Sequence, residues 1–232
     1  MKVENLKNYG VGLSRQLSAL PAEVKKGISR LGTEIIFDSV GFMRTPKLIV
    51  IYFAEKRRMK RIDLSPVREA GMKDEQFIRE QITLAAVFSA IKRTAGAEKA
   101  NEIIELLSER IGGETLEFVM PTPDDFLKFE NPFRALKDYL TSVAEGDNRE
   151  GCHRIEIVED TGDAFQMNIT YCAWFEIYKR LGVPEACLVS CNSDEVMLPG
   201  YLKPLGVRFV RTGTIAKGAS VCDFRFERLA GK

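Results

Sequence analysis

A change in hydrophobic period near residue 151 constrains the fold more than any other feature of the chain. Before it, apolar residues recur every three or four positions, and residues 74–94 and 97–111 are two clear amphipathic helices. After it, residues 154–159 and 164–171 alternate in polarity, which is typical of half-buried strands joined by a tight turn. The chain is therefore expected to combine a helical region with an antiparallel β region.

Two further strand-like segments complete the expected sheet. They cover residues 207–215 and 221–227, and they follow two short helices that begin near Ala173 and Pro184. The order strand, strand, helix, helix, strand, strand favours an α+β fold. In that fold a four-stranded, mainly antiparallel sheet carries helices on one face.

The polar stretch 145–151 is the best candidate for a linker, because it follows the last helical pattern and contains two glycines. We therefore expect a helical region at residues 1–145, packed on an α+β region at residues 152–232 that carries every cysteine. The apolar stripes of the helices suit them to cover the sheet or to form the surface of a homodimer. The helix at 97–111 is expected to stop at the glycine pair that follows it.

The charge of the chain bears on its partners. It holds 34 Lys and Arg against 33 Asp and Glu, a net charge of +1, which argues against a dedicated nucleic-acid binder. Residues 1–61 hold 13 basic and 5 acidic residues, a net charge of +8, and residues 62–232 hold 21 and 28, a net charge of −7. The basic run 55–61 could bind an anion, a membrane surface or a nucleic acid, but with no aromatic residue in it a solvated face is the simpler interpretation. We expect no nucleic-acid partner and no membrane partner.

The N-terminus and the cysteines indicate a cytoplasmic protein. The first residues are polar and no long apolar segment follows, so a secretory signal is not expected. The most apolar run, residues 48–54, is far shorter than the about 20 residues that a membrane-spanning helix needs, and it fits either a buried strand or a core helix. The odd number of cysteines, 5, favours free thiols, metal ligands or a nucleophile over a disulfide framework.

Cys172 is the leading candidate for a reactive group. It ends an expected strand and begins an expected helix. Free backbone N–H groups and the helix dipole at such a junction stabilise a thiolate and lower the pKa of the thiol. The alternative is that a small, buried thiol only fills the corner between strand and helix.

Two further pairs of polar residues could take part in chemistry. Cys191 and Asp194 lie three positions apart, so they could supply a thiol and a base, or two metal ligands. The alternative for this pair is a helix end followed by a turn. Cys222 and Asp223 are adjacent on the last strand, so only one of them faces the helices.

A metal site is another use of the same side chains. Three thiols and the single imidazole match the ligand set of a zinc or iron site: Cys172, Cys191, Cys222 and His153. Their intervals do not form the close pairs that structural zinc sites use. No dinucleotide or P-loop motif is present either. We therefore expect no cofactor, with zinc or iron as the alternative.

Five short motifs follow one another in a recognisable order, at residues 168–172, 181–185, 191–194, 211–214 and 218–226. In this order they resemble the L-2-amino-thiazoline-4-carboxylic acid hydrolase-like family. The closing glycine and Cys-Asp-Phe strand is also similar to the ligand-binding four-vinyl-reductase and vesicle-tethering folds.

The resemblance implies a hydrolase that opens a small heterocyclic isothiourea or cyclic amidine. The substrate in the family's name carries a carboxylate. Water adds at the ring carbon between sulfur and nitrogen, sulfur leaves, and an N-carbamoyl amino acid forms. Such a reaction needs a nucleophile or an activated water, an acid and base, and a cation for the carboxylate.

The resemblance also implies roles for single residues. Cys172 is the candidate nucleophile or water-orienting group. Asp194 is the candidate base, with Cys191 beside it, and Cys222 with Asp223 is a second acid–base or ligand pair. Either of two arginines could hold the substrate carboxylate in a bidentate fork. The residues expected to bind substrate are Arg211, Thr212 and Arg225.

Two other functions stay open from the sequence. One is a non-catalytic module that binds or senses a small molecule on the same scaffold, and the other is a Cys/His metal-binding protein. The catalytic interpretation requires Cys172, Cys191, Asp194 and Cys222 to meet around one site, although they are far apart in sequence.

Overall fold

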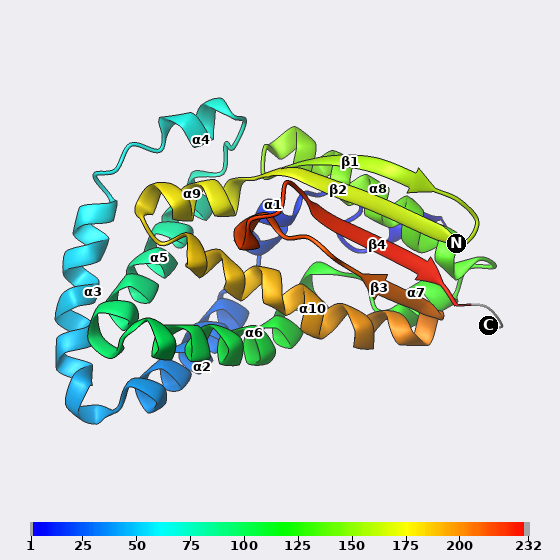
Figure 1. Ribbon diagram of the computed structural model, residues 1–232. Helices are drawn as coiled ribbons and strands as arrows, with labels where there is room; N and C mark the ends of the chain where they lie inside the picture. Colours follow the sequence, from blue (N-terminus) through cyan, green and yellow to red (C-terminus); the bar gives the residue numbers. More distant parts are fainter. Residues whose placement is uncertain (1, 230–232) are drawn as a thin grey trace.

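The computed structural model describes residues 2–229, with the backbone alone at residues 113, 114 and 117. Helices dominate before residue 151, and the sheet follows (Figure 1). The α-helices are α1 (Leu13–Ser18), α2 (Ala22–Val40), α3 (Thr45–Met59), α4 (Ser65–Glu69), α5 (Glu75–Ala95), α6 (Ala97–Val119), α7 (Pro123–Leu127), α8 (Pro132–Glu150), α9 (Ala173–Leu181) and α10 (Leu188–Leu202). The strands are β1 (His153–Asp160), β2 (Ala164–Cys172), β3 (Val207–Val210) and β4 (Cys222–Arg228). The short 3₁₀ helices are η1 (Val3–Asn5), η2 (Phe42–Arg44), η3 (Pro184–Cys187), η4 (Lys203–Leu205) and η5 (Ile215–Lys217).

The long helices form where the sequence has helical periodicity. At the start of α5, the Asp74 carboxylate accepts a hydrogen bond from the Phe77 N–H at 2.9 Å, so the predicted N-cap is confirmed. The apolar run 48–54 lies within α3 and is therefore helical, with Leu48 and Met59 buried on the side that contacts α5. None of the described helices has the length and apolar character needed to cross a membrane.

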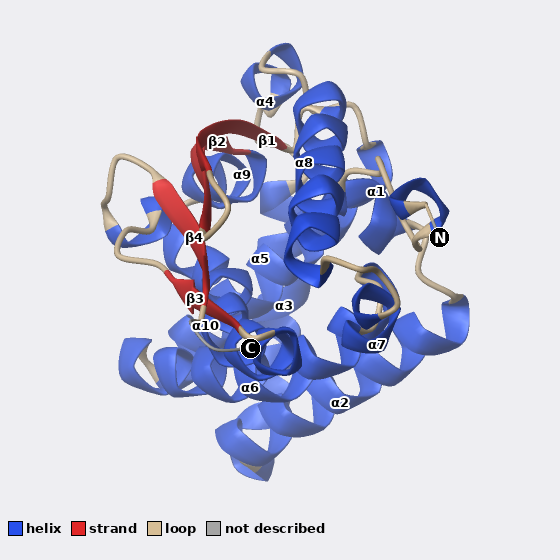
Figure 2. Cartoon of the chain, turned by 90° about the vertical axis from the view of Figure 1, so that its right-hand side faces the viewer, coloured by secondary structure: helices blue, strands red, loops and turns tan. Residues whose placement is uncertain are grey.

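The sheet has the strand order β1-β2-β4-β3, and all its neighbouring strands are antiparallel. The hairpin of β1 and β2 places His153 opposite Cys172. Helices α8 and α10 lie on one side of the sheet, where their apolar side chains share a core with Phe165 and Phe226 (Figure 2). The predicted α+β class is therefore confirmed.

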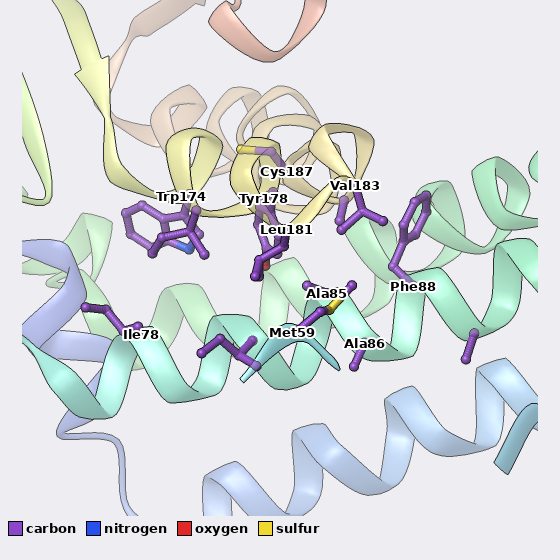
Figure 3. Packing of buried hydrophobic residues seen from close by; sticks show 14 of the residues in the cluster. Met59, Ile78, Ala85, Ala86, Phe88, Trp174, Tyr178, Leu181, Val183 and Cys187 are labelled. Carbon is purple, nitrogen blue, oxygen red and sulfur yellow. The ribbon is translucent and has the colours of Figure 1, made fainter. Parts of the chain in front are cut away.

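A second core joins the helical region to the end of the hairpin. It contains buried side chains of α3, α5, α6 and α9. In Figure 3, Trp174, Tyr178 and Leu181 point from α9 toward α5. Because α9 begins directly after Cys172, this packing fixes the position of that thiol.

The predicted end of α6 at the glycine pair is wrong, because the helix continues through Gly112 to Val119. Gly112 lies against α10, where an added Cβ would come within 2.7 Å of Met197 Sδ and 3.1 Å of Ser193 Oγ. The missing side chain therefore serves the close approach of two helices and does not end the helix.

The stretch 145–151 is not an extended linker, since α8 continues to Glu150. Gly146 lies within this helix, and an added Cβ there would come within 2.6 Å of the Gly12 backbone nitrogen. Gly151, with φ at 74°, ends the helix in the left-handed region and leads into β1. Only this second glycine acts as a chain breaker.

Two other boundaries differ from the sequence expectation. The alternative of a helix end and a turn at residues 191–194 is wrong, because these residues lie within α10. There the Ser193 hydroxyl donates to the Val189 carbonyl at 2.8 Å, so the polar side chain is satisfied within the helix. β3 ends at Val210, because Arg211 turns away from the sheet to pair with an acid of α10.

Candidate active site

The site lies where the β1–β2 hairpin meets the helical core. Cys172 is the last residue of β2 and the N-cap of α9, as the sequence predicts. The Ala173 N–H donates to the Cys152 carbonyl at 2.9 Å, which fixes the first turn of α9 against the start of β1. The thiol therefore sits at a helix N-terminus, opposite His153 in the hairpin register.

His153 is held between a carboxylate and an aromatic ring. Its Nδ1 lies 2.8 Å from Asp147 Oδ2, and both side chains are buried. The other oxygen of Asp147 accepts a hydrogen bond from the Leu13 N–H, at the start of α1, at 2.6 Å. The imidazole stacks on Trp174 with ring centroids 5.1 Å apart, and Trp174 in turn meets the edge of Phe77. Both the carboxylate and the imidazole are thus fixed in orientation.

The environment of Cys172 favours its thiolate form. A hydrogen bond from the Cys187 thiol contributes most to lowering the pKa of Cys172 well below its ordinary value, and it outweighs the opposing effect of burial. The His153 imidazole and the Phe175 backbone N–H lower this pKa further. The same Cys172 contact raises the pKa of Cys187, which therefore remains a neutral donor.

The protonation state of His153 follows from its neighbours. Burial disfavours the imidazolium, but interactions with Cys152 and Asp147, hydrogen bonds included, outweigh burial and raise the pKa of His153 well above its ordinary value. Burial also raises the pKa of Cys152 itself to about 12, so Cys152 carries no charge at neutral pH. Of these two groups, Asp147 is the one that keeps His153 protonated there. The result is a carboxylate–imidazolium–thiolate array of Asp147, His153 and Cys172.

Cys191 and Asp194 lie beside this array, on α10. The Cys191 Sγ is 3.9 Å from the Cys187 Sγ, so three thiols follow one another from Cys172. Burial raises the pKa of Asp194 to about 6, against the opposing charges of Arg211 and His153. Asp194 is therefore an acid that titrates near neutral pH.

Arg211 joins the β3–β4 loop to α10. It donates to Asp194 at 2.9 Å and to Glu195 at 2.8 Å, and it also donates to the Cys191 carbonyl. Its side chain is only 2% exposed. Two carboxylates already balance its charge, so Arg211 is not a free cation for a substrate carboxylate.

Cys222 and Asp223 hold the other side of the same loop. Cys222 faces the helices, where its Sγ accepts a hydrogen bond from the Ile215 N–H at 3.2 Å and burial raises its pKa to about 11. Asp223 accepts hydrogen bonds from the Thr212 backbone at 3.0 Å, from the Thr212 hydroxyl at 2.6 Å and from the Gly213 N–H. Cys222, Asp223 and Thr212 therefore hold the β3–β4 loop in its conformation through these hydrogen bonds.

Arg225 lies farther along β4, in another charge cluster. It pairs with Glu159, and at 2.8 Å with Glu227. Its register partner is Gln166, near the far end of β2 from Cys172. The structure thus does not bring Arg225 to the thiols.

Cys172, Cys191, Cys222 and Asp194 lie close enough to interact electrostatically with one another or with His153. The charges of Cys172 and Cys191 act on the pKa of Cys222, and that of His153 acts on the pKa of Asp194, so these groups share one electrostatic neighbourhood. It lies at the end of the hairpin, bounded by α9, α10 and the β3–β4 loop (Figure 1).

The metal-ligand set expected from the sequence is not one compact group. Among the described residues, the group whose ligand atoms all lie within 4.8 Å of one another is Asp147, Cys152 and His153. That group contains a neutral thiol, and its carboxylate already accepts hydrogen bonds from Leu13 and His153. It would need to lose a proton and rearrange to bind zinc or iron.

Sequence reasoning missed Asp147 and Cys187, and it considered His153 only as a metal ligand. The sequence offered a signal, since His153 directly precedes the first predicted strand and Cys172 directly follows the second, and the structure pairs them in register. Asp147 was hidden in the segment taken for a linker. Nothing in the sequence singled out Cys187, which reaches Cys172 through the tertiary fold.

The sequence of the chain matches a known protein family. A family model described as L-2-amino-thiazoline-4-carboxylic acid hydrolase matches residues 76–226. The matched segment begins in α5 and includes Asp147, His153, Cys172 and Cys187. No curated protein matches the chain.

Proposed function

This chain belongs to the L-2-amino-thiazoline-4-carboxylic acid hydrolase family, and we propose that it hydrolyses a small cyclic isothiourea or amidine that bears a carboxylate. The observation that carries the proposal is the array of Asp147, His153 and Cys172. It joins a thiolate at a helix N-terminus to an oriented imidazolium, the two groups that covalent catalysis by a thiol requires.

In the first step, the Cys172 Sγ attacks the ring carbon between sulfur and nitrogen. The bond between that carbon and the ring sulfur then breaks. The departing sulfur takes a proton from the His153 imidazolium, which becomes neutral. The substrate is left joined to Cys172 through an isothiourea bond, with a free thiol at its other end.

In the second step, neutral His153 takes a proton from water, and the hydroxide adds to the same carbon. The bond to Cys172 breaks, the hydroxyl proton passes to nitrogen as the carbonyl forms, and an N-carbamoyl amino acid leaves. The thiolate and imidazolium are restored. Asp147 keeps Nδ1 of His153 protonated throughout, so that the opposite ring nitrogen exchanges the proton.

Lys217 is the cation that we assign to the substrate carboxylate. Arg211 is already neutralised, whereas Lys217 lies 3.5 Å from Glu195 and its side chain is 47% exposed. Lys217 belongs to η5, which contacts the η3 segment that carries Cys187. An exposed ammonium with one weak ion pair can exchange its partner for a substrate at low cost.

The test is turnover of 2-amino-thiazoline-4-carboxylate, followed by mass spectrometry of the quenched enzyme. We expect an adduct on the tryptic peptide that contains Cys172, loss of both adduct and turnover in Cys172→Ala, and a raised KM with nearly unchanged kcat in Lys217→Ala. Cys222→Ser is the matched thiol control and keeps turnover.

Two results would contradict the proposal. One is full turnover by folded Cys172→Ala. The other is stoichiometric zinc or iron in the active protein, removed by His153→Ala together with activity, which would instead favour a metal-dependent reaction on Asp147, Cys152 and His153.

A further inference from the structure

An exposed apolar corner lies at the opposite side of the helical region from the hairpin (Figure 1). It consists of η2 and the outer face of α3. Phe42 and Met43 are each 88% exposed, Val50 is 69% exposed and Phe53 is 63% exposed. Large side chains gathered in this way on one surface mark a contact site.

The same segment is strongly basic. Residues 42–61 contain seven Lys and Arg and one acid, Glu55. Glu55 is buried, and it is already paired with Arg58 and Arg93. In the described part of the chain, no ion pair involves Arg57, Lys60 or Arg61, the last basic residues of the segment, and all three are exposed.

The apolar and basic groups follow one another along η2 and the outer side of α3, which together we call the α3 face. Val50, Phe53, Arg57 and Lys60 follow one another at helical spacing along it, after Phe42 and Met43 at its start. A shallow hollow on the surface is lined by Phe53, Ala54, Lys56, Arg57 and Lys60. The inner side of α3 packs on α5, so the α3 face is left open to solvent.

The α3 face also lies outside the catalytic machinery. It precedes residues 76–226, the segment that matches the hydrolase family. α3 and α9 both contact α5, but the site lies beyond α9, at the end of the hairpin. A partner on the α3 face would therefore not cover the site around Cys172.

We propose that the α3 face docks on an anionic lipid bilayer, with Phe42 and Met43 entering the boundary of the acyl chains and the basic residues meeting the headgroups. A membrane surface satisfies both parts of the surface at once, because it offers an apolar layer beneath a layer of negative charge. A second copy placed symmetrically on the same face would oppose two positively charged surfaces, and a phosphate backbone would leave the four apolar side chains in water. The inference departs from the sequence expectation of no membrane partner.

The experiment is sedimentation of the full chain with phosphatidylcholine vesicles, with and without phosphatidylserine. We expect binding to the anionic vesicles, at least tenfold weaker binding to the neutral ones, and a further loss when salt is raised. Phe42→Ser with Met43→Ser, and separately Arg57→Glu with Lys60→Glu, should each weaken binding at least tenfold.

The matched control is Lys203→Glu with Arg228→Glu, which makes the same charge change at exposed residues of η4 and β4. This control should bind as the unchanged protein does, and circular dichroism should show that all variants are folded. The proposal is overturned if neither vesicle sediments the protein, or if the control loses binding as strongly as the Arg57 and Lys60 variant. It is also overturned if Phe42→Ser with Met43→Ser converts a dimer into a monomer without weakening vesicle binding. None of these readouts depends on hydrolase activity.

Discussion

Replacing Asp147 by Asn tests the part of the thiolate's stabilisation that comes from His153. In the structure one carboxylate oxygen accepts the Leu13 N–H at 2.6 Å and the other lies 2.8 Å from His153 Nδ1. An amide has one oxygen and one NH₂. If the oxygen stays with Leu13, the NH₂ faces His153, and Nδ1 must then accept a hydrogen bond. The imidazole is thereby held in its neutral form, and Cys172 loses the cation that lowers its pKa.

The size of the effect follows from this loss of charge. We expect the pKa of Cys172 to rise, because the thiolate loses an opposite charge beside it, and each unit of the rise is equivalent to about 1.4 kcal/mol. At a pH below the pKa of Cys172, each unit by which this pKa rises reduces the thiolate fraction about tenfold. The more basic thiolate is, however, about threefold more nucleophilic. At a fixed pH, alkylation therefore slows only about threefold or fourfold for each unit. The midpoint of the pH profile is therefore the better readout.

The assay is the rate of iodoacetamide alkylation at Cys172 between pH 4 and 9, followed by peptide mass spectrometry. Asp223→Asn is the matched control, because Asp223 lies at the same end of the sheet but bonds Thr212 and Gly213 and does not contact His153. It should leave the midpoint unchanged. An unchanged midpoint in folded Asp147→Asn would refute the carboxylate–imidazolium–thiolate array.

Two further predictions concern stability. Burial raises the pKa of Asp194 to about 6, so the folded protein holds this proton more tightly than the unfolded chain, and the free energy of unfolding falls as pH rises from about 4 to 6. Urea unfolding of Asp194→Asn should lack this decline. Parallel pH curves for the two proteins would contradict the role of Asp194. Gly146→Ala would place a Cβ 2.6 Å from the Gly12 nitrogen, so we expect a loss of about 1–3 kcal/mol in thermal or urea unfolding. Gly27→Ala, in α2 with open space around it, should be neutral or stabilising by up to about 1 kcal/mol, and equal effects of the two alanines would contradict the packing argument.

Local periodicity in the sequence predicts much of the fold. The hairpin, the cap of α5 by Asp74 and the placement of Cys172 at a strand–helix junction all depend on neighbours in sequence, and all were predictable. The predictions failed at Gly112 and Gly146, where the sequence predicted a helix end or a linker and the structure has a continuous helix. Each allows a close approach to another segment, and a sequence pattern cannot distinguish such a glycine from a chain breaker.

The candidate site was predictable only in part, for a similar reason. The thiols and Asp194 carry recognisable chemistry, and the structure places them in one electrostatic neighbourhood at one end of the sheet. The residues that decide their protonation are different ones. Asp147 and Cys187 act through tertiary contacts that join α8 and η3 to the hairpin, and Arg211 proved to be neutralised by acids of α10.

The N-terminal helices take part in this arrangement, although the site residues lie after residue 146. The Leu13 N–H at the start of α1 is fixed on Asp147, and the Gly12 N–H donates to Glu150 at 3.2 Å one turn farther along α8. Without the Leu13 N–H, Asp147 would be a buried carboxylate with one of its two oxygens lacking a hydrogen bond, which is costly in free energy. The start of α1 therefore does more than cover α8. Its Leu13 N–H fixes the Asp147 carboxylate by a hydrogen bond. That carboxylate keeps His153 charged, and the charge of His153 favours the thiolate of Cys172.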